Sequence, residues 1–181
     1  MKRSPLLFFA AAAVIALAVY IINPYGTASL DPRARIWGIT FFSMPSRSMQ
    51  PTLNPGDLIV VETFAYRSSE PAPGDIVVYR APHSDNAFVG RVVAQGGDRI
   101  AFADSVVTRN GERRDERYIL PGKTLCRLAN FPEIAVPDGR LFIAGDNRCN
   151  SLDSRMFGTV SRDKLIGKVV YVLGGTEETP G

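Results

Sequence analysis

Two serines separated by one arginine are the residues that point most directly to chemistry. Residues 45–53 read PSRSMQPTL, which places Ser46 and Ser48 two positions apart. A serine hydroxyl becomes an effective nucleophile only when a neighbouring base accepts its proton. Serine is also an ordinary turn residue, so this stretch predicts a nucleophile only if the rest of the chain supplies partners.

Further motifs follow this stretch in a fixed order. SMQPTL is followed by LNPGD, GDIVVYR, RVVAQGGDRI and finally GDNRCNSLDSR at 145–155. With these motifs behind an apolar N-terminal run, the chain resembles the bacterial type I signal peptidases over most of residues 36–172. The resemblance implies a membrane-anchored serine endopeptidase that removes signal peptides from exported pre-proteins after small-x-small sites. It implies a β-rich catalytic domain of short twisted strands behind one transmembrane helix, and no cofactor.

The resemblance assigns roles to individual positions. Ser48 matches the nucleophile, and its N–H would form the oxyanion hole together with the Ser46 hydroxyl. One such donor stabilises a transition state by about 3 kcal/mol. Ser151 matches a serine that orients the base, while Asp153 and Arg155 match a pair that supports the site. Without the resemblance, that pair would be an ordinary surface ion pair of small value.

One catalytic position departs from the family pattern. The family uses a buried neutral lysine as its base, because burial lowers the pKa of an amine. Aligning FVGRVV on the lysine motif places Gly90 at that position. The neighbouring Arg91 points to the opposite strand face and stays protonated, so it cannot replace the lysine. We expect the glycine to leave space for a lysine from another strand or for a water.

Other candidate bases lie elsewhere in the chain. His83 is seven positions before Gly90 in the stretch APHSDN, which predicts an exposed loop residue. Relatives outside bacteria carry a histidine directly at the lysine's place, which differs from the position of His83. Lys123, Lys164 and Lys168 are expected to be solvated surface lysines.

Two functional hypotheses follow from the missing lysine. The first is an active signal peptidase with a base that is not yet identified. The alternative is a non-catalytic paralogue that binds exported peptides or a membrane partner. A pilin-processing peptidase of the same superfamily fits less well, because SMQPTL is closer to the general signal peptidases. By the same resemblance, an extended peptide would add as a strand beside Met44, Pro45 and Val89.

An N-terminal run predicts a membrane anchor. Residues 5–22 form an uncharged apolar stretch that, at 1.5 Å per helical residue, spans most of a bilayer core of about 30 Å. Lys2 and Arg3 favour a cytoplasmic N-terminus, residues 1–4, with the remaining chain on the outer side of the plasma (inner) membrane. A weak cleavage site near Ala28 leaves a cleaved signal peptide as the alternative.

The remaining chain predicts a mainly β domain. We expect a linker over 23–35, a β domain over 36–173 and a disordered tail over 174–181. Turn signals such as NPGD and APGD precede apolar runs, and the polar stretch 110–138 is expected to be a loop. The predicted strands are 36–44, 57–66, 75–80, 87–95, 99–103, 105–109, 140–145 and 166–173.

Composition argues against nucleic acid and metal as partners, whereas the resemblance implies signal peptides and the apolar run implies membrane lipid. The net charge of +3 includes Lys2 and Arg3, which leaves +1 on the remaining chain, so nucleic acid is not indicated. One histidine and two cysteines cannot build a usual structural zinc site. Whether Cys126 and Cys149 form a disulfide, whether substrates are general or dedicated, and the oligomeric state are left open. Trp37, Phe41 and Phe42 could rest in the membrane interface or in the core.

Overall fold

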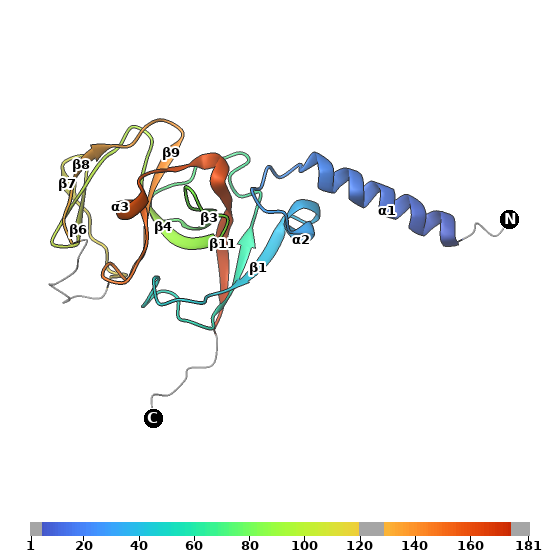
Figure 1. The fold of residues 1–181 in the computed structure, drawn as a ribbon, viewed down its shortest axis with the longest axis horizontal. Helices are drawn as coiled ribbons and strands as arrows, with labels where there is room; N and C mark the ends of the chain where they lie inside the picture. Colours follow the sequence, from blue (N-terminus) through green and yellow to red (C-terminus); the bar gives the residue numbers. More distant parts are fainter. Residues whose placement is uncertain (1–4, 120–128, 175–181) are drawn as a thin grey trace, which may run out of the picture.

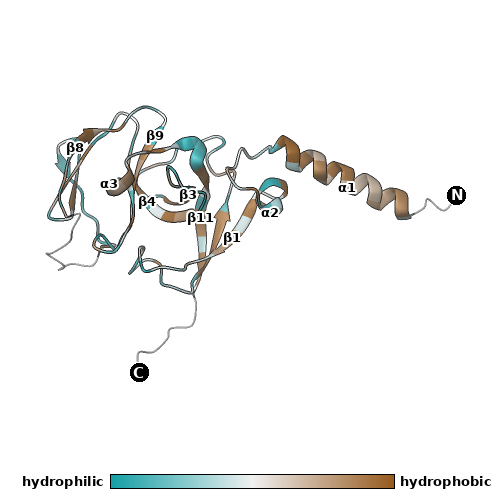
Figure 2. Ribbon diagram, viewed as in Figure 1, coloured by the Kyte–Doolittle hydropathy of each residue, from teal (hydrophilic) through white to brown (hydrophobic). Residues whose placement is uncertain are grey.

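A single apolar helix projects from a β domain in the computed structural model, which describes residues 5–119 and 129–174. Helix α1 (Pro5–Ile22) contains 18 residues, none of them buried against the rest of the chain. Figure 1 shows it extending away from the strands, and the brown colour of its ribbon in Figure 2 marks mostly hydrophobic residues. By length and composition this helix could cross a membrane. Residues 1–4 lie outside the described part of the chain.

The predicted linker contains ordered structure. Asp31 caps the short helix α2 (Pro32–Ile36), because its carboxylate accepts a hydrogen bond from Arg33 N and a proline follows at the first helical position. Before α2, Ala28 N donates to Leu165 O, and Thr27 Oγ1 donates to the Ile166 carbonyl. The chain leaving α1 is therefore attached to the β domain along this segment.

A seven-stranded antiparallel sheet forms the larger part of the domain. Each neighbouring pair of strands in this sheet is antiparallel. In order across the sheet, the strands are β1 (Ile39–Ser43), β2 (Leu58–Glu62), β11 (Leu165–Leu173), β3 (Ile76–Arg80), β4 (Ala87–Gln95), β9 (Arg140–Ala144) and β10 (Val160–Ser161).

A second sheet of four strands extends from the far end of the domain (Figure 1). Two of its strands lie within 110–138, so the expectation of a continuous loop there is wrong. Strand β8 escapes detection because Pro132 and Glu133 interrupt its apolar alternation. In order, the strands are β7 (Glu112–Arg113), β6 (Val106–Arg109), β5 (Arg99–Ala103) and β8 (Phe131–Ala135). The remaining short elements are α3 (Ser154–Phe157) and the 3-10 turn η1 (Arg162–Lys164).

The two repeated Pro-Gly-Asp sequences are turns that start strands, as predicted. Asp57 N donates to Asn54 O, and Asp75 N donates to Ala72 O, so each turn closes with the same hydrogen bond. The intervening Gly56 and Gly74 have φ values of +91° and +105°, which glycine adopts without steric cost. These turns set where β2 and β3 begin.

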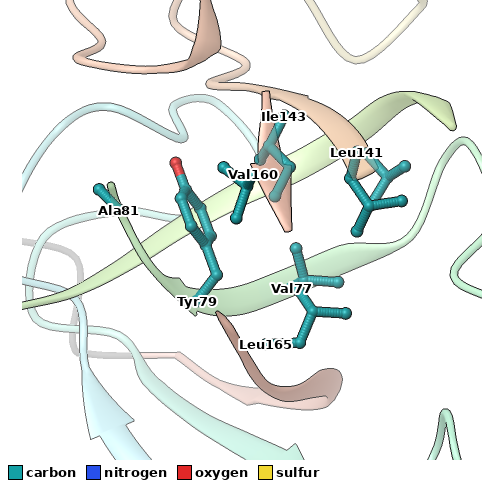
Figure 3. Close-up of a cluster of buried hydrophobic side chains, with 8 residues drawn as sticks. Val77, Tyr79, Ala81, Leu141, Ile143, Val160 and Leu165 are labelled. Atoms are coloured by element: carbon teal, nitrogen blue, oxygen red, sulfur yellow. The ribbon is translucent and has the colours of Figure 1, made fainter. Parts of the chain in front are cut away.

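One of three buried clusters lies directly beside Gly90, the residue that the sequence alignment places at the lysine position. Figure 3 shows side chains from β3, β9, β10 and β11 pointing toward one another in this cluster. Tyr79 from β3 and Ile143 from β9 are almost completely buried there. Gly90 pairs with Val77 across β3 and β4, which places it at the edge of the same cluster.

Candidate active site

Ser48 lies in the connection between β1 and β2, on a loop held by buried methionines. Met44 N donates to Asp57 O and Met44 O accepts from Gly56 N, both at 2.8 Å, which closes the base of the loop. Met44 and Met49 bury their side chains in the core below, whereas Ser48 stays partly exposed. The loop therefore presents Ser48 on a fixed backbone at the surface.

The structure brings the two serines of the first motif together. Ser46 Oγ and Ser48 Oγ are 3.0 Å apart, within hydrogen-bond distance. The Ser46 hydroxyl also lies 3.5 Å from Ser48 N. The two groups that the sequence predicts as oxyanion donors, the Ser46 hydroxyl and the Ser48 N–H, therefore both lie next to the candidate nucleophile, with the N–H donating to the hydroxyl.

The GDNR segment after β9 wraps around the Ser48 loop. Asn147 N donates to Ser48 O, and Asn147 Nδ2 donates to Arg47 O, both at 3.0 Å. A Cβ atom at Gly145 would lie 2.6 Å from both Ser48 O and Ser151 Cβ, which no real Cβ contact tolerates. Glycine is therefore required at 145, and it lets Ser48 and Ser151 approach each other.

Asp153 and Arg155 form a buried ion pair beneath this segment. Their side chains are 2% and 0% exposed, so this is not the surface pair that a bare sequence reading would give. Asp153 accepts hydrogen bonds from Arg155 and from Gly145 N, and Arg155 donates to Arg148 O. The pair links α3 to the backbone that contacts Ser48.

A second buried ion pair was not identified from the sequence. Arg91 Nε donates to Asp146 Oδ1 at 2.9 Å, and Arg91 Nη2 donates to Asp146 Oδ2 at 2.7 Å. Thr52 bonds the same carboxylate, and the ring of Tyr118 lies 3.8 Å from the guanidinium carbon. Burial opposes the charge of Arg91, but its bonds to Asp146 outweigh burial and raise its pKa. The sequence signal for this buried pair is the charged Arg91 within the otherwise apolar strand FVGRVV.

A third buried pair connects the site to the second sheet. Arg148 bonds Glu116 through two hydrogen bonds of 2.9 and 2.7 Å, and its Nε donates to Gly145 O. Both side chains of this pair are largely buried. The contact between Arg148 and Glu116 could not be predicted from the sequence, because Glu116 lies in a stretch without regular alternation of apolar and polar residues.

The space expected beside Gly90 is absent. A Cβ atom at this position would lie 2.6 Å from Ile143 Cγ2 and 3.4 Å from Tyr79 Cε1. The Ile143 side chain therefore packs against β4 at Gly90 and fills the space that a side chain at this position would need. A side chain from another strand has no room to enter this place.

The candidate replacement bases lie elsewhere among the described residues. His83 is exposed in the loop between β3 and β4, as predicted, and Lys164 is exposed in η1. Lys168 is partly buried rather than simply solvated, because its Nζ bonds Asp75 at 2.7 Å. Within residues 5–119 and 129–174, the hydrogen-bond partner of the Ser48 hydroxyl is Ser46, and neither a lysine nor a histidine bonds it. Lys123 lies outside the described residues.

Two of the three predicted peptide-binding residues, Met44 and Val89, belong to one apolar cluster. Val89 packs against the buried cluster that contains Met44, while Pro45 is exposed. The Met44 side chain is 2% exposed and its N–H and C=O already bond the β2 side. Any peptide contact at this point would therefore involve Pro45 and Val89 more directly than Met44.

Other predicted features are only partly described. Cys149 is disulfide-bonded, and the only other cysteine of the chain, Cys126, lies outside the described residues. Residues 175–181 of the predicted tail also lie outside. In the part of the chain that the structure describes, no three His, Cys, Asp or Glu side chains gather as a metal site.

Comparisons with known proteins agree on one family. The family model "Signal peptidase, peptidase S26" matches residues 2–173. A Synechocystis sp. protein named "Probable signal peptidase I-1" is 37% identical over 136 residues, covering 71% of this chain and 67% of its own. Signal peptidase I of Bacillus caldolyticus is 34% identical over 147 residues, covering 76% of this chain and 80% of its own.

A solved structure was also found. The crystal structure of a signal peptidase I from Enterococcus faecalis V583 is 24% identical, with a TM-score of 0.49, covering 56% of this chain and 98% of its own. The family model spans the strands and the loops of the site described above. The chain therefore belongs to the signal peptidase family, peptidase S26, whose members are serine endopeptidases.

Proposed function

We propose that this protein is a membrane-anchored signal peptidase that cleaves signal peptides from exported pre-proteins after small-x-small sites. The observation that carries the proposal is the 3.0 Å contact between the Ser46 and Ser48 hydroxyls. They lie on a loop whose backbone carbonyls accept two hydrogen bonds from Asn147. This geometry supports a nucleophile with adjacent oxyanion donors. Its three buried ion pairs keep the surrounding backbone rigid, as a preorganised site requires.

The proposed reaction begins at Ser48. Its Oγ attacks the scissile carbonyl carbon, and the carbonyl oxygen becomes an oxyanion held by Ser48 N–H and the Ser46 hydroxyl. The Ser48 proton passes to a base and then to the leaving amine as the peptide bond breaks. Water then hydrolyses the acyl-enzyme ester and regenerates Ser48.

Residue 90 does not supply the base in this scheme. We propose that Gly90 stands where the family has its lysine, and the packing of Ile143 against it supports a site that has lost that amine. The proton acceptor must therefore come from another position. Ser151, close to both Gly145 and Ser48, is proposed to orient that acceptor.

An exposed apolar surface supports attachment of the domain to a membrane beside α1. Trp37 is 69% exposed and Phe41 is 42% exposed, and both lie near the end of α2 and on β1. Tyr171 and Leu173 extend the same surface onto β11, where they pair with β2 residues opposite β1. Phe42 is half-buried and packs into the core, so it does not contribute. We propose an N-terminus in the cytoplasm and the β domain on the outer side of the plasma membrane.

Cleavage by the detergent-solubilised full chain tests the proposal. A pre-protein with an Ala-x-Ala site should be cut by the wild type and left intact by Ser48→Ala. Ser68→Ala is the matched control, because Ser68 is an exposed serine outside the site and its replacement should leave the rate unchanged. Absence of cleavage by the wild type over long incubation would rule out the peptidase activity.

The packing at Gly90 also favours a second candidate function. A family member without a base would bind exported peptides or a membrane partner without cutting them, and the packing of Ile143 against Gly90 is the observation that favours it. In that case wild type and Ser48→Ala should bind a signal peptide with equal affinity while neither cleaves it. Equilibrium binding of a labelled signal peptide measures this directly.

A further inference from the structure

A short turn that follows β7 contacts the two buried arginines that hold the backbone beside the Ser48 loop. Glu116 and Tyr118 lie in this turn, which is closed by a hydrogen bond of 3.0 Å from Ile119 N to Glu116 O. Figure 1 shows the second sheet, to which β7 belongs, at the end of the domain away from α1. The sequence motifs indicate no role for either residue, and the proposed reaction does not use them.

The carboxylate of Glu116 fixes the first of these arginines. It accepts two hydrogen bonds from Arg148 and one from the Tyr118 hydroxyl, at 2.7 to 2.9 Å. Arg148 in turn donates its Nε to Gly145 O at 3.0 Å. Burial raises the pKa of Tyr118 and the bond to Glu116 adds to this effect, so the phenol stays protonated and acts as a donor. The turn therefore orients the guanidinium that holds Gly145.

The ring of Tyr118 contacts the second arginine. Its centroid lies 3.8 Å from the guanidinium carbon of Arg91, well within the range of a cation–π contact. Arg91 bonds both carboxylate oxygens of Asp146, which also accepts a hydrogen bond from Thr52 Oγ1. Thr52 lies on the same β1–β2 connection as Ser48. A displacement of Arg91 would therefore reach the Ser48 loop as well as Asp146.

Gly145 connects this network closely to Ser48. Its N–H donates to Asp153 and its C=O accepts from Arg148, so buried side chains hold the peptide groups on both sides. The ideal Cβ position of Gly145 lies only 2.6 Å from Ser48 O. Because the backbones are in such close contact, a shift at Gly145 would move Ser48. A misplacement of about 1 Å at a reacting group can lower a rate about 100-fold.

We propose that Glu116 and Tyr118 are positioning residues for Ser48. They act through the two buried arginines on the backbone that contacts the Ser48 loop. The arginines of this network face two carboxylates, so its charges are balanced and it requires no ligand. This inference rests on the proposed peptidase activity and deepens it, because it gives the second sheet a part in holding the nucleophile.

Cleavage kinetics of the detergent-solubilised full chain test the proposal. Glu116→Gln and Tyr118→Leu should each lower kcat for an Ala-x-Ala pre-protein at least roughly tenfold, which is part of the loss expected for a misplacement of about 1 Å. KM should stay unchanged, because the predicted peptide contacts at Pro45 and Val89 do not belong to this network. Tyr118→Phe keeps the ring over Arg91 and loses the bond to Glu116. Its kcat should lie between those of the wild type and Tyr118→Leu.

The matched control is Arg117→Gln, which removes an exposed ion pair from the same turn. The side chains of Arg117 and its partner Asp115 are 90% and 71% exposed, so kcat should equal that of the wild type. The backbone amide resonances of Ser48 and Gly145, measured by NMR in detergent micelles, give a readout that does not require cleavage. Tyr118→Phe should shift both resonances although the aromatic ring is retained, whereas Arg117→Gln should shift neither. Thermal melting checks that each variant folds.

Three kinetic outcomes would overturn the positioning role: wild-type kcat in a folded Tyr118→Leu variant, a loss that comes from KM alone, or an equal loss in Arg117→Gln. Unmoved Ser48 and Gly145 resonances in Tyr118→Phe would also overturn it. If the wild type does not cleave, the proposed peptidase activity fails, and the resonances still decide whether the turn positions Ser48.

Discussion

The Cγ2 methyl of Ile143 occupies the place into which a side chain at Gly90 would extend, 2.6 Å from the ideal Cβ position. Ile143 is completely buried and comes from β9, the strand that leads directly into the GDNR segment. Restoring an amine at position 90 therefore requires a change on the facing strand as well. Paired substitutions at residues 90 and 143 can therefore test whether position 90 accepts a basic side chain.

Gly90→Lys alone should destabilise the fold without raising cleavage. Overpacking a filled core costs about 1–3 kcal/mol, and the β-branched Ile143 has little freedom to move away. Ile143→Ala alone should cost about 2–5 kcal/mol by leaving a cavity. Because each change relieves the other, the double variant should be more stable than the sum of the single effects predicts.

Urea denaturation of all four proteins measures this coupling, and cleavage of an Ala-x-Ala pre-protein measures activity. The double variant should cleave faster than Ile143→Ala, because only it carries an amine with room to enter the site. Strict additivity of the two stability changes would show that residues 90 and 143 do not compete for the same space.

The Asp153–Arg155 pair should contribute far more to stability than an exposed pair of the same chemistry. Asp153→Ala removes the carboxylate that forms the ion pair with the buried Arg155 guanidinium, which is expected to cost about 3–5 kcal/mol. Glu133→Ala removes the partner of Arg99 in a pair whose side chains are 42% and 61% exposed, and should cost about 0–1 kcal/mol. The free energy of unfolding from urea denaturation gives both values. Equal losses would mean that burial does not set the value of the Asp153 pair.

The strands could be predicted because their signal is local. All eight predicted segments contain a strand, since alternating or continuous β-branched runs between Pro-Gly-Asp and Asn-Gly turns specify both period and boundaries. Helix α2 was missed because five residues cannot show a helical period, and β8 because Pro132 and Glu133 mask its alternation. Their conformations depend on the capping of α2 by Asp31 and on the pairing of β8 with β5.

The features of the candidate site likewise fall into those that could be predicted from the sequence and those that could not. Ser46, Ser48, Asp153 and Arg155 were predicted from motifs, and the structure shows each pair in contact. The filling of the Gly90 position by Ile143 could not be predicted, because it depends on the register of β4 against β9. That register shifts between Val92 and Ala94, and no single-strand pattern specifies such an irregularity.

Asp31 should make the attachment of α2 sensitive to acid. Its hydrogen bond with Arg33 is the main cause that lowers its pKa from 3.8 to about 2, with burial opposing this and Thr40 adding to it. A lowered pKa means that the stabilisation is complete above the ordinary value and is lost as the pH falls from about 4 to about 2. Asp31→Asn keeps a capping group but cannot titrate. The stability difference between wild type and this variant should therefore shrink over that interval, as measured by urea denaturation at each pH. A constant difference would show that Asp31 does not carry the effect.

Gly145→Ala should disrupt the site because the added methyl group has nowhere to go. The new Cβ would lie 2.6 Å from Ser48 O, so the Ser48 loop and Ser151 would have to move apart. We expect cleavage to fall by at least about 100-fold, since small displacements of reacting groups have effects of that size. Gly174→Ala is the matched control, because no atom of the described residues lies within 4 Å of its added Cβ, and it should leave the rate unchanged. Normal cleavage by Gly145→Ala would mean that the close approach of Gly145 to Ser48 is not needed for the reaction, and the role proposed for Ser151 would then be lost with it.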